Sequence, residues 1–159
     1  MTEKKTEGDP LSEGLKKLRA PFPKECYGKL KKGGAELDYI EHAAMTDRLL
    51  TVDPLWNWEP LAVGADGLPV VRTSSKVASL WIRLTVLGKT VIGVGTCELG
   101  KNEVEKELIG DALRNAAMRF GVALDLWSKA ELESELDAGP VDRQTGEVRG
   151  PQPRPPAQQ

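Results

Sequence analysis

The feature that most restricts the fold is a pair of apolar runs between Ser79 and Glu98, separated by a glycine-containing turn. In the first run, apolar residues stand at every second position, which is the period of a strand with one buried face. The apolar set is Leu80, Ile82, Leu84 and Val86. Gly88 and Lys89 predict a tight two-residue reversal into the second run. The segment therefore predicts an antiparallel hairpin with one face against a core.

A long amphipathic helix is predicted after the hairpin. Between Glu103 and Phe120, the apolar residues occupy a little over half of the helical wheel. An apolar surface that wide requires a large partner, and the sheet is the one available. Gly121 is a credible terminator, because helices commonly end at a residue that tolerates the left-handed conformation.

The residues before the hairpin predict a second helix and further strands. Residues 35–50 place their apolar side chains on one arc of a helical wheel, and Pro54 limits this helix because the residue before a proline is pushed out of the helical region. Trp56 and Trp58 lie on one face of an extended stretch, and residues 63–69 predict a turn. The fold class is therefore α+β, with an N-terminal helix, an antiparallel sheet meander and a long helix packed across the sheet.

Composition divides the chain into three regions. Residues 1–34 form a basic segment containing glycine and proline, residues 35–129 carry nearly all the periodic signal, and residues 130–159 are acidic and proline-rich. The last composition cannot bury a core and predicts a disordered tail. The net charge of −2 hides a basic stretch from Lys16 to Lys32, in which seven basic residues face one acidic residue. Such segregation is compatible with binding a polyanion, although charge runs are often only solvated surface.

Several classes of protein and site are disfavoured by the sequence. No apolar stretch approaches the roughly 20 residues of a membrane helix, and the polar N-terminus lacks the apolar core of a signal peptide, so we expect a cytoplasmic protein. Cys26 and Cys97 lie outside any CxxC spacing, and His42 is the only histidine. No P-loop pattern is present. We predict no cofactor and no metal site.

The final helix resembles a known family. The segment KELIGDALRNAAMRFGVALDLW is similar to the C-terminal helix of the single-strand annealing domain in the Rad-fifty-two, Sak and Erf superfamily. The matching positions are Lys106, Glu107, Asp111, Leu113, Arg114, Ala116, Phe120, Gly121, Ala123 and Leu124. The hairpin resembles the same family in IRLTVLGK and in IGVG at 92–95, and the region before it is similar to phage and prophage members. The resemblance covers residues 19–129.

This resemblance implies a non-enzymatic protein with a β-β-β-α core. Such proteins assemble into rings or helical arrays, bind single-stranded DNA in an outer groove and anneal complementary strands in recombination without nucleotide hydrolysis. An exonuclease or a single-strand binding protein is an implied partner, and a phage-encoded member would act in the host cytoplasm. Family members related to the eukaryotic protein carry two further basic residues on the final helix, where this chain has Asn115 and Met118. The grip on DNA from that helix is therefore expected to be lighter.

The predicted DNA-binding residues are basic side chains on four segments. Arg114 lies on the polar face of the final helix, and Arg83 points away from the core side of its strand. We expect these two residues and the lysine cluster at 29–32 to form one phosphate-binding surface. The full set is Arg114, Arg83, Lys106, Lys29, Lys31, Lys32, Arg72 and Lys76.

Each of these residues also has a plainer interpretation. Arg114 could pair with Glu107 or Asp111, Arg83 could form a cross-strand ion pair, and the loop residues could simply be solvated. The tryptophans could stack on bases, but packing in the core or between subunits is favoured for most of them. They are Trp56, Trp58, Trp81 and Trp127. Arg119 and Asp47 fall in apolar arcs, which predicts that they are buried and paired.

Two other functions are left open by the sequence. The first is an RNA-binding or structural nucleic-acid-binding module with the same helix-on-sheet shape. The second is a small metal-dependent nuclease, which would require clustered carboxylates. Asp38, Glu41 and Asp47 are spread around the predicted helical wheel, so the nuclease is the weaker alternative.

Overall fold

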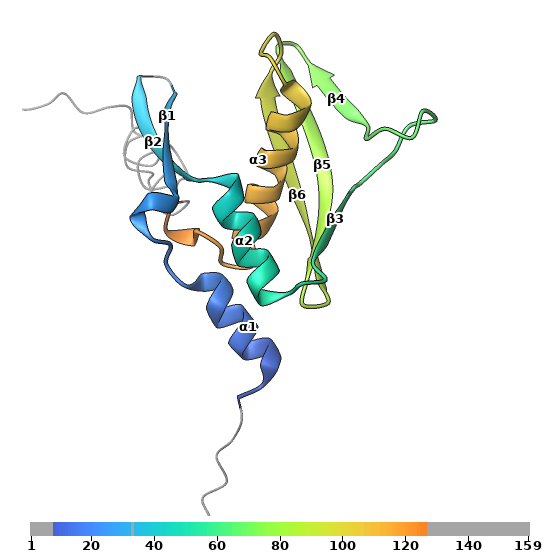
Figure 1. Cartoon of the computed structure of the whole chain (residues 1–159). Helices are drawn as coiled ribbons and strands as arrows, with labels where there is room; N and C mark the ends of the chain where they lie inside the picture. Colours follow the sequence, from blue (N-terminus) through green and yellow to red (C-terminus); the bar gives the residue numbers. More distant parts are fainter. Residues whose placement is uncertain (1–7, 33, 127–159) are drawn as a thin grey trace, which may run out of the picture. The chain divides into compact units, whose positions relative to one another are not determined.

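The computed structural model describes residues 8–32 and 34–126. The helices and strands named below lie between Pro10 and Met118, within one compact unit (Figure 1). Along the chain they are α1 (Pro10–Arg19), a short 3-10 turn (Lys24–Cys26), β1 (Tyr27–Lys32), β2 (Ala35–Ile40), α2 (His42–Val52), β3 (Asn57–Pro60), β4 (Val71–Ser74), β5 (Val77–Val86), β6 (Lys89–Glu98) and α3 (Val104–Met118). Every strand pairing is antiparallel, and the predicted α+β class is confirmed.

The main sheet is built around β5. Strand β6 pairs with β5 along its whole length, whereas β3 and β4 share the other edge of β5 one after the other. Burial alternates strictly along β5, so the apolar set of the hairpin faces the core as predicted. Residues 61–70 leave the sheet between β3 and β4 and return through an isolated bridge from Val63 to Pro69 (Figure 1).

The hairpin turn lies one residue earlier than predicted. Val86 pairs with Lys89, so Leu87 and Gly88 are the two turn residues, and both have positive φ. This is the requirement of the turn that best matches strand twist. A hydrogen bond holds Leu87 in this left-handed conformation: its backbone N–H donates to a carboxylate oxygen of Asp53 at 2.7 Å.

Helix α3 packs directly on β5 and β6, as Figure 1 shows. Gly93 and Gly95 of β6 face the helix, and a Cβ atom on Gly93 would stand 2.7 Å from the backbone oxygen of Ala112. The two glycines therefore allow the helix backbone to touch the strand. The apolar side of α3 supplies much of the core through Leu108, Ala112, Leu113, Ala116 and Ala117.

The predicted helix over residues 35–50 is wrong in its first part. Residues 35–40 form β2, which pairs with β1 in a separate two-stranded hairpin, and helix α2 begins only at His42. The apolar residues of this segment fit both a helical arc and the two-residue alternation of a strand. The segment forms a strand because β1 is available to pair with it. Because β1 and α1 both precede residue 34, the basic N-terminal segment contributes structure: Leu18 and Phe22 are buried.

Arg48 of α2 fixes this N-terminal segment. Its guanidinium donates to the backbone oxygens of Lys17, Leu18, Ala20 and Pro21, at distances between 2.6 and 3.4 Å. It also lies 3.8 Å from the centroid of the Phe22 ring. The last carbonyl groups of a helix have no partner within it, so one arginine satisfies the end of α1 and ties it to α2.

Candidate nucleic-acid interface

Arg114 lies where the middle of α3 faces the β1–β2 hairpin. Its guanidinium carbon is 5.7 Å from the centroid of the Tyr39 ring on β2, and its side chain is 23% exposed. Gly110, one turn earlier on the helix, leaves space beside the guanidinium, since a Cβ there would still be 3.7 Å away. The ion pair with Asp111 is long, at 3.9 Å. The positive charge is therefore held in place by its surroundings without being tightly neutralised.

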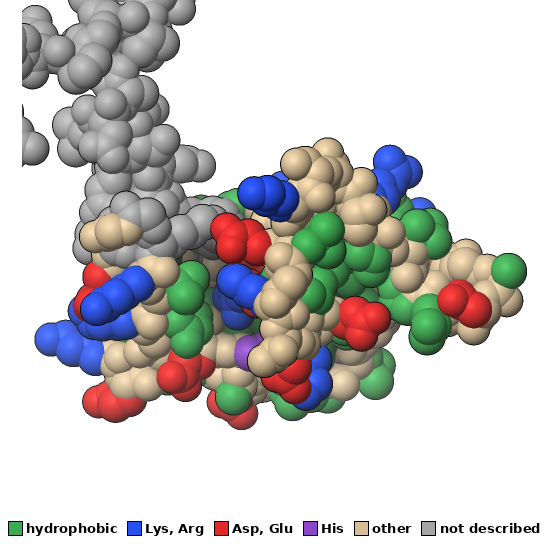
Figure 2. All heavy atoms as spheres, turned by 90° about the horizontal axis from the view of Figure 1, so that it is seen from above, with side chains coloured by type: hydrophobic (Ala, Val, Ile, Leu, Met, Phe, Trp, Pro, Cys, Tyr) green, Lys and Arg blue, Asp and Glu red, His purple; other side chains and the backbone are tan. Residues whose placement is uncertain are grey.

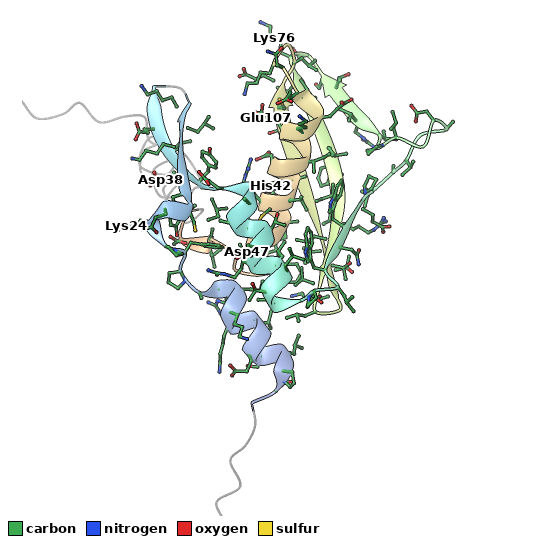
Figure 3. All side chains as sticks on the ribbon, viewed as in Figure 1. Lys24, Asp38, His42, Asp47, Lys76 and Glu107 are labelled. Carbon is green, nitrogen blue, oxygen red and sulfur yellow. The ribbon has the colours of Figure 1, made fainter. Side chains whose placement is uncertain are left out.

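His42 joins Arg114 and Tyr39 from a third element. It is the first residue of α2, and Figure 3 shows it between the hairpin and α3. Burial, and after it the charge of Arg114, lower the pKa of His42 below its ordinary value of 6.5. The imidazole is consequently neutral at pH 7. We call Tyr39, His42 and Arg114 the cleft cluster.

One face of the hairpin extends the cleft cluster with apolar groups. Leu30 and Leu37 pair across β1 and β2 and share the face of Tyr39, and Leu30 is 50% exposed. The Tyr39 ring lies against Gly28, where no side chain could be accommodated without a shift. An aromatic ring and an apolar strip thus border a fixed guanidinium, which is a combination suited to bases and phosphate.

Lys29 and Lys31 of β1 lie on the other face of the hairpin. Lys29 contacts Glu36 at 2.7 Å and Asp38 at 3.8 Å, and these carboxylates, Glu36 first, raise the pKa of Lys29. Lys31 follows Lys29 on the same face and is exposed. The side chain of Lys32 lies outside the described part of the structure. Carboxylates therefore offset the charge of Lys29, and neither Lys29 nor Lys31 lies on the face of the hairpin that carries Tyr39.

Arg83 and Arg72 lie on the face of the main sheet that is turned away from α3. Arg83 alternates with the buried residues of β5, and its Nη1 atom is 3.6 Å from the Glu59 carboxylate on β3, in the cross-strand pair that was the alternative interpretation. Arg72 stands opposite Ser79 on β4. These arginines cannot share a surface with Arg114, because the sheet separates them.

The remaining predicted lysines lie near the end of the sheet away from α1. Lys76 is exposed in the β4–β5 turn, and Figure 3 shows it at the tip of the main sheet. Glu107 pairs with Lys101 at 3.0 Å, and this contact is the main cause of the lowered pKa of Glu107. Lys106 pairs with Glu103 within the same helix. Figure 2 shows basic and acidic side chains interleaved over this view of the molecule.

Two polar residues of α3, Asp111 and Asn115, accept hydrogen bonds from the main sheet. Backbone N–H groups of Thr96 and Val94, on the outer edge of β6, donate to Asp111 at 2.8 Å and to Asn115 at 3.1 Å. Side chains thereby cover part of an exposed strand edge. This gives Asn115, which departs from the basic family pattern, a defined structural role.

Sequence reasoning missed Tyr39 as a member of this cluster, and it did not group His42, which is exposed, with Arg114. The signal was the Gly33-Gly34 pair between two alternating runs, which would have predicted the hairpin and brought Tyr39 to its end. The predicted burial of Arg119 and Asp47 is wrong, because both are exposed and Arg119 donates to Asn115. Trp127 lies outside the described residues. Among residues 8–32 and 34–126, no group of three histidine, cysteine or acidic side chains could hold a metal ion.

The chain is similar in sequence to two proteins from the genus Deinococcus. The single-stranded DNA-binding protein DdrA of Deinococcus radiodurans is 29% identical over 135 residues, covering 80% of this chain and 61% of that protein. DdrA of Deinococcus deserti is 30% identical over 125 residues, covering 74% of this chain and 58% of that protein. The relatives are single-stranded DNA-binding proteins. The chain spans between 58% and 61% of their length, and no protein-family model matches it.

Among the described residues, none of the helices is long and apolar enough to cross a lipid bilayer.

Proposed function

We propose that the chain binds single-stranded DNA through the cleft cluster and anneals complementary strands without nucleotide hydrolysis. The observation that carries the proposal is the guanidinium of Arg114, fixed beside the Tyr39 ring and only loosely paired with Asp111. The similarity to DdrA supports the nucleic acid as the ligand.

The chemistry of the cluster matches a single strand better than a duplex. A guanidinium binds phosphate oxygens irrespective of sequence, and an aromatic ring stacks on any base that is not already paired. In a duplex the bases are stacked on one another, so Tyr39 and the apolar face of the hairpin would have no partner. Annealing requires further that the bases outside this contact remain free to test a second strand.

The proposal includes assembly into a homo-oligomer, which would align many cleft clusters along one strand. Its support is the resemblance to ring-forming annealing proteins. Light scattering of the full chain at micromolar concentration, with and without DNA, tests this part. One chain of 17.3 kDa per particle under both conditions, after the mass of any bound DNA is subtracted, would exclude assembly.

Replacement of Arg114 by alanine tests the binding site. We expect weaker binding to single strands of any sequence, and a log–log salt slope lower by about 0.7, the value for one phosphate contact on a single strand. Arg119→Ala is the matched control, because Arg119 is an exposed arginine at the end of the same helix and donates to Asn115.

Parallel titrations with duplex DNA and RNA, and pairing of labelled complementary strands, complete the test. Full affinity in Arg114→Ala would remove the cleft cluster as the site. Equal binding of RNA and single-stranded DNA would favour the RNA-binding alternative.

A further inference from the structure

The open face of the main sheet carries a pocket that the proposed function does not use. The pocket has a volume of about 320 Å³ and is lined by Leu61, Ala62, Val70, Arg72 and Trp81. It lies where the chain leaves the sheet between β3 and β4. The N–H of Leu61 donates to the backbone oxygen of Trp81 at 2.8 Å, and the N–H of Val70 donates to that of Ala62 at 2.9 Å, which holds the two ends of this segment together beside Trp81.

Trp81 is an unusual residue to find open on a sheet surface. It alternates with the buried residues of β5, points away from α3 and is 43% exposed. Trp81 pairs with Val94 of β6, so both apolar side chains lie on this face of the sheet. A partly exposed aromatic ring in such a place is available to stack on a base.

Two arginines flank Trp81 along the sheet. Arg83 follows it by two residues on β5, and Arg72 lies opposite Ser79, which precedes it by two residues. Within the described residues, Arg72 forms no ion pair. Arg83 has only the 3.6 Å contact with an exposed Glu59 carboxylate, and exposed pairs of this kind contribute little. Each guanidinium is therefore available to a phosphate.

We propose that this pocket, with Trp81 as its floor and Arg72 at its rim, is a nucleobase-binding site for single-stranded nucleic acid, separate from the cleft cluster. The inference rests on the proposed function for its ligand and adds a second contact on the opposite face of the sheet. The charge favours this occupant over a second copy of the chain. A protein covering the face would remove two arginines from water, whereas a single strand supplies a phosphate on either side of the stacked base.

Trp81→Ala, Trp81→Phe and Arg72→Ala test the site, with oligothymidylate and an abasic strand of equal length as probes. Stacking on one aromatic residue predicts that Trp81→Ala binds oligothymidylate between about fivefold and about 150-fold more weakly, with an unchanged salt slope. Trp81→Phe should keep most of the affinity. Arg72→Ala should lower the salt slope by about 0.7. The abasic strand should bind Trp81→Ala and the unchanged chain equally.

The outcomes separate this site from the cleft cluster. If Arg114→Ala weakens binding and Trp81→Ala does not, the pocket is no base site and the proposed function stands. If neither substitution matters, both proposals fail. A changed molecular mass of Trp81→Ala in light scattering without DNA would make the face a contact between copies and overturn the inference. Thermal unfolding at the temperature of the unchanged chain confirms that each variant folds.

Discussion

The contact between β6 and α3 gives the sharpest test of the fold. Replacing Gly95 with alanine would place a Cβ atom 2.6 Å from the backbone nitrogen of Ala112, and closer still to the oxygen of Leu108. Ordinary Cβ contacts begin at 3.4 Å, so the helix backbone must retreat by at least about 0.8 Å at Ala112 and by more at Leu108. Backbone atoms cannot rotate away as a side chain can, so the whole of α3 must move.

The cost of Gly95→Ala has two parts. Overpacking of a well-filled core destabilises by about 1–3 kcal/mol. The retreat of α3 also stretches the hydrogen bonds from Thr96 and Val94 to Asp111 and Asn115, and each such bond contributes about 0.5–1.5 kcal/mol. We therefore expect a loss of about 3 kcal/mol in the free energy of unfolding.

Gly110→Ala is the matched control on the same helix. Its new Cβ would meet nothing nearer than Arg114 at 3.7 Å, so the gain in helix propensity should stabilise the chain by about 0.5–1 kcal/mol. Urea unfolding followed by circular dichroism measures both variants. A midpoint of Gly95→Ala close to that of the unchanged chain, with an equal m value, would refute this account of the glycines.

Three further predictions concern other parts of the chain. Arg48→Ala should lower the free energy of unfolding by about 2 kcal/mol, because helix α1 loses a charged donor to its terminal carbonyls; unchanged urea unfolding and unchanged hydrogen exchange in α1 would contradict this. His42 has a lowered pKa in the folded chain, so its contribution to stability is present above pH 6.5 and is lost as the pH falls through the folded pKa. His42→Gln should remove that part of the pH dependence in thermal unfolding. A chain ending at Ala130 should keep its affinity for single strands in a titration, because the acidic, proline-rich sequence that follows cannot bury a core.

The sequence predicted correctly those helices and strands whose spacing of apolar residues is compatible with only one kind of secondary structure. The alternation along β5 and the wide apolar arc of α3 each fit one structure only, and both are confirmed. Residues 35–40 fit two periods, and the strand is selected by pairing with β1, a contact between residues that are distant along the chain. The position of Leu87 in the turn is similarly decided by its hydrogen bond to Asp53. Local pattern carries no information on such partners.

The candidate site was less predictable because it depends on which face each element presents. The sequence predicts that Arg114 and Arg83 point away from the core, and both do. They point in opposite directions, however, because Arg114 lies on the helix that covers one face of the sheet and Arg83 lies on the other face. Lys29 is likewise exposed as expected, yet its charge is offset by Glu36 across the hairpin. The spacing of apolar residues in the sequence predicts which side chains are exposed. Which exposed side chains lie together depends on how the helices and strands pack.

Helix α3 links the stability of the fold to the geometry of the cleft cluster. Within about one turn, Ala112 rests on the glycines of β6, Asp111 bonds to the strand edge, and Arg114 reaches the ring of Tyr39. The three residues lie on different sides of one rigid helix, so none of their contacts can shift without the others. A helix displaced by Gly95→Ala must also change the position of Arg114 relative to Tyr39. The glycines of β6 therefore fix the position of Arg114, the DNA contact that we propose, on the other side of the helix.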